Sequence, residues 1–154
     1  FDLAALLTSP IQPYTSFSRG TMCVIVGRGS LSEIVGAPDL VLQMLDKLID
    51  NAVDFSPPGS TVRLRLSADR DSAMATLEID NEGPPLPVAA GDRLFESLWQ
   101  HRRGEDGRPH FGLGLYIVKL ITDFHAGGAR AEDLAGPPGG VRFSVRLARN
   151  VADL

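Results

Sequence analysis

Several features that identify particular protein classes are missing from this chain of 154 residues. Cys23 is the only cysteine, which excludes an internal disulfide and a cysteine-based metal site and fits a reducing compartment. No apolar run approaches the roughly 20 residues that span a bilayer, and the first ten residues lack the basic segment of a signal peptide. The net charge of −4, without a basic block, argues against nucleic acid as a partner.

The histidines give no metal signal either. His101, His110 and His125 do not have the spacing of metal ligands, so we expect no zinc site. What remains is the composition of a globular protein, with 44% hydrophobic and 22% charged residues. This length suits one domain with a real core, and we expect it to cover residues 1–150, with 151–154 as a tail.

Alternation of apolar and polar side chains predicts three strands, and a short run of β-favouring residues predicts a fourth at 21–27. Their expected ranges are 21–27, 61–68, 73–80 and 139–148. The third alternates through Met74, Leu77 and Ile79 with one slip in phase. Because a short turn joins the second and third strands, we expect them to form an antiparallel hairpin.

Helical spacing of apolar residues predicts two long helices. The first runs from an N-cap at Asp39 to about Phe55, where prolines follow. The second begins near Leu113 and ends before a left-handed cap at Gly127 or Gly128. Its expected apolar stripe is Leu113, Ile117, Leu120, Ile121 and Phe124. The pattern indicates an α+β fold: a two-layer α/β sandwich with a mostly antiparallel sheet and helices on one face.

The first predicted helix carries an asparagine where an apolar residue is expected. Asn51 belongs on the same side as Met44, Leu48 and Phe55. A buried leucine there would gain roughly 1.5–3 kcal/mol, whereas a buried amide without a partner costs roughly 1–3 kcal/mol. Either Asn51 is a satisfied polar residue at the rim of the core, or its oxygen faces a cleft and binds a hard cation such as Mg²⁺.

Two further segments contain glycines in suggestive places. In "NEGPPLP", directly after a strand, Gly83 permits close approach to a flat ligand, and Asn81 offers an acceptor and donors to a purine edge. In "GLGL", Gly112 and Gly114 open a helix whose N-terminal N–H groups suit a phosphate. Taken singly, the first segment is also explained as a stiff turn and the second as an ordinary helix start.

In their order and spacing these segments resemble a known family, the catalytic, ATP-binding domain of sensor histidine kinases. The wider group includes DNA gyrase, mismatch-repair and chaperone ATPases. "DKLIDNAVDFSPPG" resembles its asparagine box, "NEGPPLP" its first glycine box, "LFESLW" its phenylalanine box and "FGLGLYIVKLI" its second glycine box. "FHAGG" and "GGVRFSVRL" resemble its closing helix end and final strand. The resemblance covers about Phe1 to Arg149 and implies a Bergerat-type ATP-binding fold.

The resemblance implies a role for each box. Asn51 would bind the Mg²⁺ that bridges the ATP phosphates, Asn81 would contact adenine, and Gly83 would lie against the base. Gly112 and Gly114 would give way to the phosphates.

Other nucleotide-binding positions implied by the resemblance flank these residues. Leu113 and Leu115 belong to the second glycine box. Phe95 would anchor a lid that extends to about His110. Arg102 and Arg103 in that lid would steer or clamp phosphate, unless they are solvated loop arginines.

The chain departs from the family pattern at four positions. Asn81 stands where the family has an aspartate; strand phase favours it over neighbouring Asp80 as the residue on the inner face. Pro85 replaces the second glycine of its box. Lys47 stands where another asparagine is common, and we include it among the nucleotide-binding positions. Asp54 replaces a basic residue, and a carboxylate there would repel ATP.

The implied function is transfer of the γ-phosphoryl group of Mg-ATP to a histidine on a separate dimerisation domain. None of the three histidines has the context of that acceptor, so we expect an acceptor hairpin upstream and no autophosphorylation by this chain alone. The whole protein would be a membrane-anchored homodimer with this domain in the cytoplasm, acting on a response regulator.

Two alternatives remain open. One is an anti-sigma-type protein-serine kinase, which shares the fold and size. The other is a nucleotide-binding regulatory module with weak or no phosphoryl transfer, motivated by Asp54 and Asn81.

Overall fold

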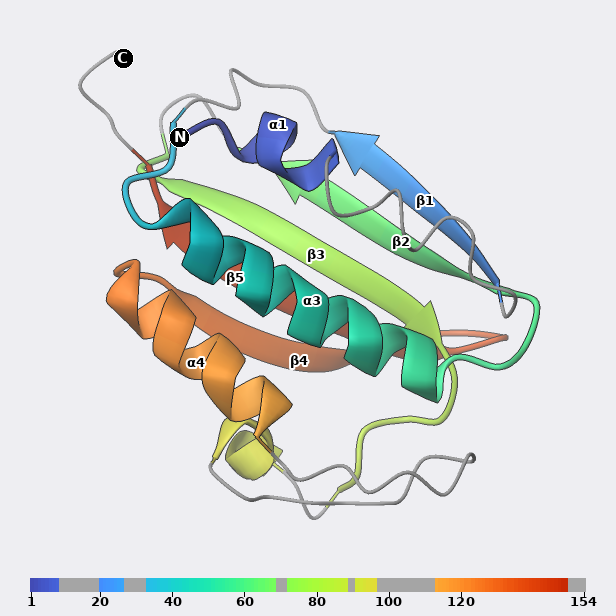
Figure 1. Ribbon diagram of the computed structural model, residues 1–154. Coiled ribbons are helices and arrows are strands. Elements are labelled where there is room, and N and C mark those ends of the chain that lie inside the picture. The colour runs from blue at the N-terminus through green and yellow to red at the C-terminus, as the bar shows by residue number, and fades with distance from the viewer. Residues whose placement is uncertain (9–19, 27–32, 69–71, 89–90, 97–112, 150–154) are drawn as a thin grey trace.

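The computed structural model describes residues 1–8, 20–26, 33–68, 72–88, 91–96 and 113–149 (Figure 1). In chain order the elements are α1 (Leu3–Thr8), β1 (Gly20–Val26), α3 (Pro38–Phe55), β2 (Ser60–Ser67), β3 (Met74–Glu82), the 3₁₀ helix η1 (Gly91–Phe95), α4 (Gly114–Phe124), β4 (Gly128–Leu134) and β5 (Gly140–Ala148).

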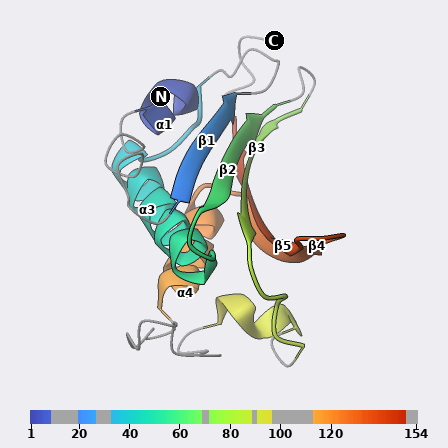
Figure 2. The same cartoon turned by 90° about the vertical axis from the view of Figure 1, so that its right-hand side faces the viewer.

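The described strands form one five-stranded sheet in the order β1-β2-β3-β5-β4. β1 runs parallel to β2, and every other neighbouring pair is antiparallel. The helices α1, α3 and α4 lie on one face of this sheet, as the edge-on view of Figure 2 shows. The two-layer α/β sandwich with a mostly antiparallel sheet is therefore confirmed, as is the hairpin of β2 and β3.

The core lies between the helices and the inner face of the sheet. On β3 the buried side chains are Ala75, Leu77, Ile79 and Asn81. The expected slip in phase is wrong, because Met74 is only half-buried and Ala75 occupies the inner position. Strict alternation therefore holds from the first residue of the strand to the last.

The start of α3 also differs from expectation. Its N-cap is Ala37, without a side-chain capping bond, and Pro38 follows in the first turn. Asp39, predicted as the cap, lies inside the first turn. Proline at this position needs no N–H partner and has a preset φ, so it moves the helix start upstream. A carboxylate in the first turn still interacts favourably with the helix dipole.

The buried face of α4 is rotated from the predicted stripe. Its buried residues are Val118, Ile121 and Thr122. Leu113, Leu120 and Phe124 are 43%, 49% and 66% exposed. Spacing alone misplaced the stripe because this helix has more apolar residues than its packed face buries, so the sequence did not identify which of them pack.

The C-terminal end of α4 corrects a second expectation. Ala126, with φ of 50°, takes the left-handed conformation predicted for Gly127 or Gly128. Gly127 is required for a different reason: a Cβ there would lie 1.7 Å from the Arg146 carbonyl oxygen on β5. The glycine therefore permits a close backbone crossing.

Strand β4 was not predicted. Its sequence, GARAEDL, contains glycine, alanine and acidic residues, which have low β-propensity, and no long apolar alternation. It forms at the edge of the sheet because β5 supplies a full set of antiparallel partners, from Gly128 opposite Arg146 to Leu134 opposite Gly140. Tertiary pairing thus outweighs local preference here.

Candidate functional site

Helices α3 and α4 pack side by side and bring two of the predicted residues together (Figure 1). A Cβ added at Gly114, the first residue of α4, would lie 4.0 Å from the Lys47 Cδ on α3. Asn51 follows Lys47 by four residues, about one helical turn, and is half-buried. The last turns of α3 and the first turn of α4 therefore form one end of the helix pair.

Acidic residues accompany Lys47 on this part of α3. Desolvation raises the pKa of Asp50, and Lys47 opposes this effect. The carboxylates of Asp54 and Asp46 raise the same pKa further. Asp54, the residue that departs from the family pattern, is half-buried and lies close enough to Asp50 for this repulsion. The local charge is therefore mixed rather than basic.

Asn81 near the end of β3 has an unusual environment. Its side chain is 3% exposed, and its Nδ2 donates to the Glu82 carbonyl oxygen at 3.0 Å. Its Oδ1 is buried and accepts no hydrogen bond from the described residues. A buried acceptor without a donor costs roughly 1–3 kcal/mol. A ligand that donates a hydrogen bond to this oxygen would remove that cost.

The neighbouring Asp80 is committed elsewhere. It lies on the outer face of the sheet, where Arg142 Nε and Nη2 each donate to its carboxylate at 2.7 Å. The hydrogen bond with Asp80 is the main cause that raises the pKa of Arg142. Asn81, and not Asp80, is therefore the polar side chain on the inner face, as strand phase predicts.

Gly83 lies directly against the end of α3. Its φ is 144°, and a Cβ there would lie 2.4 Å from the Phe55 carbonyl oxygen. Both the backbone conformation and this contact require glycine. Glycine is therefore required here by the fold itself, whether or not a base binds against it. The contact with Phe55 places the loop after β3 beside the last turn of α3.

Phe95 ends η1 and joins it to the core. Its ring meets that of Phe143 on β5 edge-to-face, with centroids 6.3 Å apart and planes at 83°. Leu94 beside it is buried. Phe95 thus ends a short 3₁₀ helix that starts at Gly91.

The remaining predicted positions are divided between described and undescribed parts of the chain. Leu115 is half-buried and packs on the core, whereas Leu113 is exposed. Arg102, Arg103 and Gly112 lie outside the described residues, as does the rest of the predicted lid.

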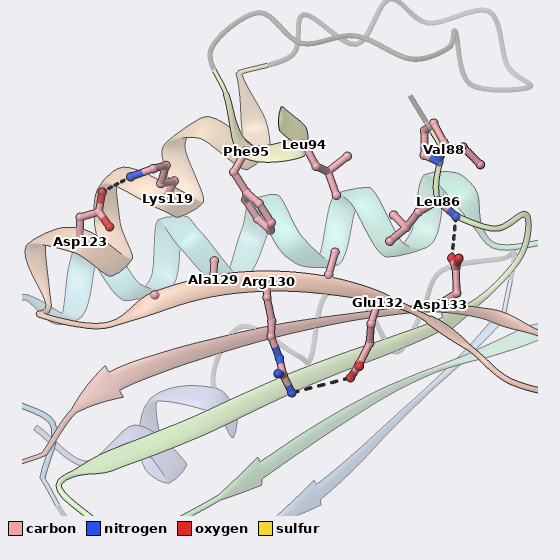
Figure 3. A pocket seen from close by; sticks show the side chains of 13 residues that line it. Leu86, Val88, Leu94, Phe95, Lys119, Asp123, Ala129, Arg130, Glu132 and Asp133 are labelled. Carbon is pink, nitrogen blue, oxygen red and sulfur yellow. Dashed lines mark hydrogen bonds and ion pairs between the residues drawn. The ribbon is translucent and has the colours of Figure 1, made fainter. Parts of the chain in front are cut away.

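A hollow of about 680 Å³ opens between η1, α4 and β4, beside Phe95 (Figure 3). Strand β4 faces it with the small residues Ala129 and Ala131, which leave the space unfilled. Asp133 Oδ1 accepts a hydrogen bond from the Leu86 N–H at 2.7 Å, which ties the loop after β3 to β4. Among the predicted nucleotide-binding residues that the structure describes, only Phe95 lines the hollow.

Within the described residues, no group of three or more histidine, cysteine, aspartate or glutamate side chains is arranged to hold a metal ion. An Mg²⁺ carried by a nucleotide needs fewer protein ligands, because phosphate oxygens and water complete its shell. In the same part of the chain, no helix is long and apolar enough to cross a membrane.

Comparison with known proteins agrees with this geometry. The chain is 35% identical over 125 residues to the signal transduction histidine-protein kinase/phosphatase MprB of Mycobacterium sp. (strain KMS). The alignment covers 80% of this chain and 23% of that protein, so the chain spans about a quarter of the length of this relative.

Solved structures show the same fold. A mycobacterial sensor histidine kinase MprB matches with a TM-score of 0.80 and 27% identity, covering 97% of this chain and 96% of that one. Full-length ShkA in complex with AMPPNP matches with a TM-score of 0.77 and 25% identity, covering 100% of this chain and 32% of that one.

The family comparison covers most of the chain. Residues 36–151 match the family described as "Histidine kinase-, DNA gyrase B-, and HSP90-like ATPase". This range includes both helices of the pair, the hairpin and the last two strands, and with them Asn51, Asn81 and Gly114. The chain therefore belongs to the histidine kinase-, DNA gyrase B- and HSP90-like ATPase family.

Proposed function

We propose that this chain is the ATP-binding catalytic domain of a two-component sensor kinase. It would deliver the γ-phosphoryl group of Mg-ATP to a histidine on a separate dimerisation domain. The observation that carries the proposal is the buried Asn81 Oδ1, which accepts no hydrogen bond from the described residues and lies on the inner face of the sheet. The exocyclic amine of adenine is a donor that fits it.

Other residues would bind the metal ion and the phosphates of the nucleotide. Asn51 would supply one oxygen ligand to Mg²⁺, since its amide stands beside the apolar stripe of α3 near Lys47. Lys47 next to Gly114 would place a positive charge where α4 begins, and the first N–H groups of that helix favour phosphate. Bound Mg²⁺ supplies charge neutralisation of the phosphates during transfer.

This arrangement provides binding and positioning, which suits phosphoryl transfer. Such transfer depends mostly on holding the phosphate in line and stabilising its charge, so a domain without its own acceptor can carry the catalytic part. The names of the relatives support a sensor kinase, and the ShkA complex holds an ATP analogue in a protein of the same fold. The whole protein would be a membrane-anchored homodimer with this domain in the cytoplasm, and its signal would pass to a response regulator.

Calorimetric titration tests the nucleotide site. Wild type and Asn51→Ala are titrated with ATP in the presence and absence of Mg²⁺, with Gln43→Ala as a matched loss of an exposed amide on the same helix. We expect Asn51→Ala to lose the Mg²⁺-dependent part of the affinity and Gln43→Ala to retain it. Equal affinities for wild type and Asn51→Ala under both conditions would contradict the assignment of Asn51.

The transfer step is tested by incubating the chain with labelled ATP, alone and with a purified acceptor hairpin. We expect acid-labile phosphate on the hairpin and none on this chain. Nucleotide binding without any transfer would favour the regulatory-module alternative instead.

A further inference from the structure

His125, directly after α4, is fully committed to backbone groups of three elements. The side chain is 2% exposed, and its Nδ1 lies 2.7 Å from the Ile121 carbonyl oxygen. Its Nε2 accepts a hydrogen bond from the N–H of Ala37, the N-cap of α3, at 3.0 Å. Its own carbonyl accepts from the Ala148 N–H of β5 at 3.2 Å. One residue thus joins the end of α4, the start of α3 and the end of the central sheet.

These partners determine which ring nitrogen of His125 carries the proton. A carbonyl can only accept, so Nδ1 carries the proton and donates to Ile121; an N–H can only donate, so Nε2 is unprotonated and accepts from Ala37. The chain around it is shaped for an imidazole. Gly36 has a φ of 154°, and a Cβ there would lie 2.0 Å from the His125 Cδ2.

The bond to Ala37 is directional, whereas apolar packing is not. Met44, Leu48 and Val118 belong to the same buried cluster, and their packing already restricts how α4 lies against α3. The hydrogen bond adds a directional restraint that apolar contacts lack. The hydrogen bond fixes one end of the pair.

The other end of the pair is the candidate nucleotide site. The helices run in opposite directions, since His125 meets the start of α3 while Gly114 lies next to Lys47, ten residues into the helix. The 11 residues of α4 span about 16 Å. A tilt of about 5–10° at the His125 end would displace Gly114 by roughly 1–3 Å. A displacement of about 1 Å is enough to disturb a binding or reacting geometry.

We propose that His125 is a positioning residue for the nucleotide site: its Nε2 bond to Ala37 sets how α4 lies against α3, and so sets the spacing between Lys47 and Gly114. This inference rests on the proposed function for its readout by nucleotide. It assigns no contact between His125 and the ligand.

Two substitutions separate the two ring bonds. In His125→Asn the amide nitrogen takes the place of Nδ1 and keeps the bond within α4, but no atom reaches Ala37. In His125→Gln the longer side chain places its amide oxygen near the position of Nε2 and keeps the bond between the helices. Each variant loses one buried hydrogen bond, so both should unfold at a lower temperature than wild type.

Nucleotide affinity should tell the variants apart. We expect the dissociation constant for Mg-ADP to rise at least fivefold in His125→Asn and to stay within twofold of wild type in His125→Gln. A purely structural role predicts that affinity follows thermal stability in both variants. Equal affinities in the two variants would overturn the proposal.

A second readout needs no nucleotide. Spin labels at Gln43→Cys on α3 and Leu120→Cys on α4, both exposed positions, report the distance between the helices in a Cys23→Ser background. We expect a shifted or broadened distance distribution in His125→Asn and the wild-type distribution in His125→Gln. An unchanged distribution in His125→Asn would refute the positioning role. Failure of the wild-type chain to bind nucleotide would instead refute the proposed function, and the labels would still decide the role of His125.

Discussion

Replacing Asn81 with leucine should stabilise the domain without nucleotide and abolish its stabilisation by nucleotide. The buried Oδ1, which has no donor among the described residues, costs roughly 1–3 kcal/mol, and leucine removes that oxygen while burying an apolar side chain of similar shape. The loss of the bond from Nδ2 to the Glu82 carbonyl offsets about 1 kcal/mol of that gain. With the apolar burial of leucine added to these two terms, we expect a net gain of about 1–2 kcal/mol.

The assay is thermal unfolding of both proteins with and without Mg-ADP. For a domain of this size, a gain of about 1–2 kcal/mol corresponds to a rise in Tm of roughly 2–8 °C. Nucleotide at 100 times its dissociation constant stabilises a binding-competent domain by about 2.7 kcal/mol. Without nucleotide, Asn81→Leu should therefore be more stable than wild type. When nucleotide saturates wild type, wild type should become the more stable protein.

Ser144→Ala is the matched control. The Ser144 Oγ is also buried without a described partner, but Ser144 pairs with Glu78 and lies on the face of the sheet away from the helices. This variant should keep the full nucleotide shift. If Asn81→Leu unfolds at a lower temperature than wild type without nucleotide, the estimated cost of the unpaired oxygen is wrong. If it keeps the nucleotide shift, Asn81 is not part of the site.

The two acidic residues near Lys47 give further predictions. Asp54→Lys should tighten ATP binding by roughly tenfold, about 1–2 kcal/mol, and added salt should reduce the gain; unchanged dissociation constants at low and high salt would show that Asp54 does not face the phosphates. Asp50→Asn should raise the Tm at pH 7. Because the fold raises the pKa of Asp50, its favourable contribution is complete below the ordinary value of 3.8 and is lost as pH rises through the folded-state pKa. The Tm difference should therefore disappear below about pH 3.8, and a difference that persists there would contradict a charge effect.

Most of the fold could be predicted because its main segments are strongly periodic. The α3 helix and the alternating strands β2, β3 and β5 have patterns that agree with the sides they bury. The exceptions share a physical cause: their structure depends on packing or pairing with segments that are distant in sequence. Strand β4 exists because β5 pairs with it, and the buried face of α4 is chosen by α3 and the sheet rather than by its own hydrophobicity.

The candidate site divides in the same way. The position of Asn81 on the inner face follows from strand phase, and its residue type signals an unusual core position. The unpaired Oδ1 and the approach of Lys47 to Gly114 could not be predicted, because both depend on how separate elements pack. The positioning role proposed for His125 could not be predicted, since the sequence does not show whether a histidine at a helix end has a buried or a solvated ring.

The pairing of β3 with β5 has a consequence for chain length. These adjacent strands close a long loop of sequence, and 31 residues, from Gly83 to Leu113, connect β3 to α4 within it. The entropy of closing such a loop grows only with the logarithm of its length, so even a doubling of the whole loop would cost about 0.6 kcal/mol. Folding therefore places little restraint on how many residues lie between the first glycine box and α4. Chains with shorter or longer segments at this point are therefore compatible with the same sheet and helix pair.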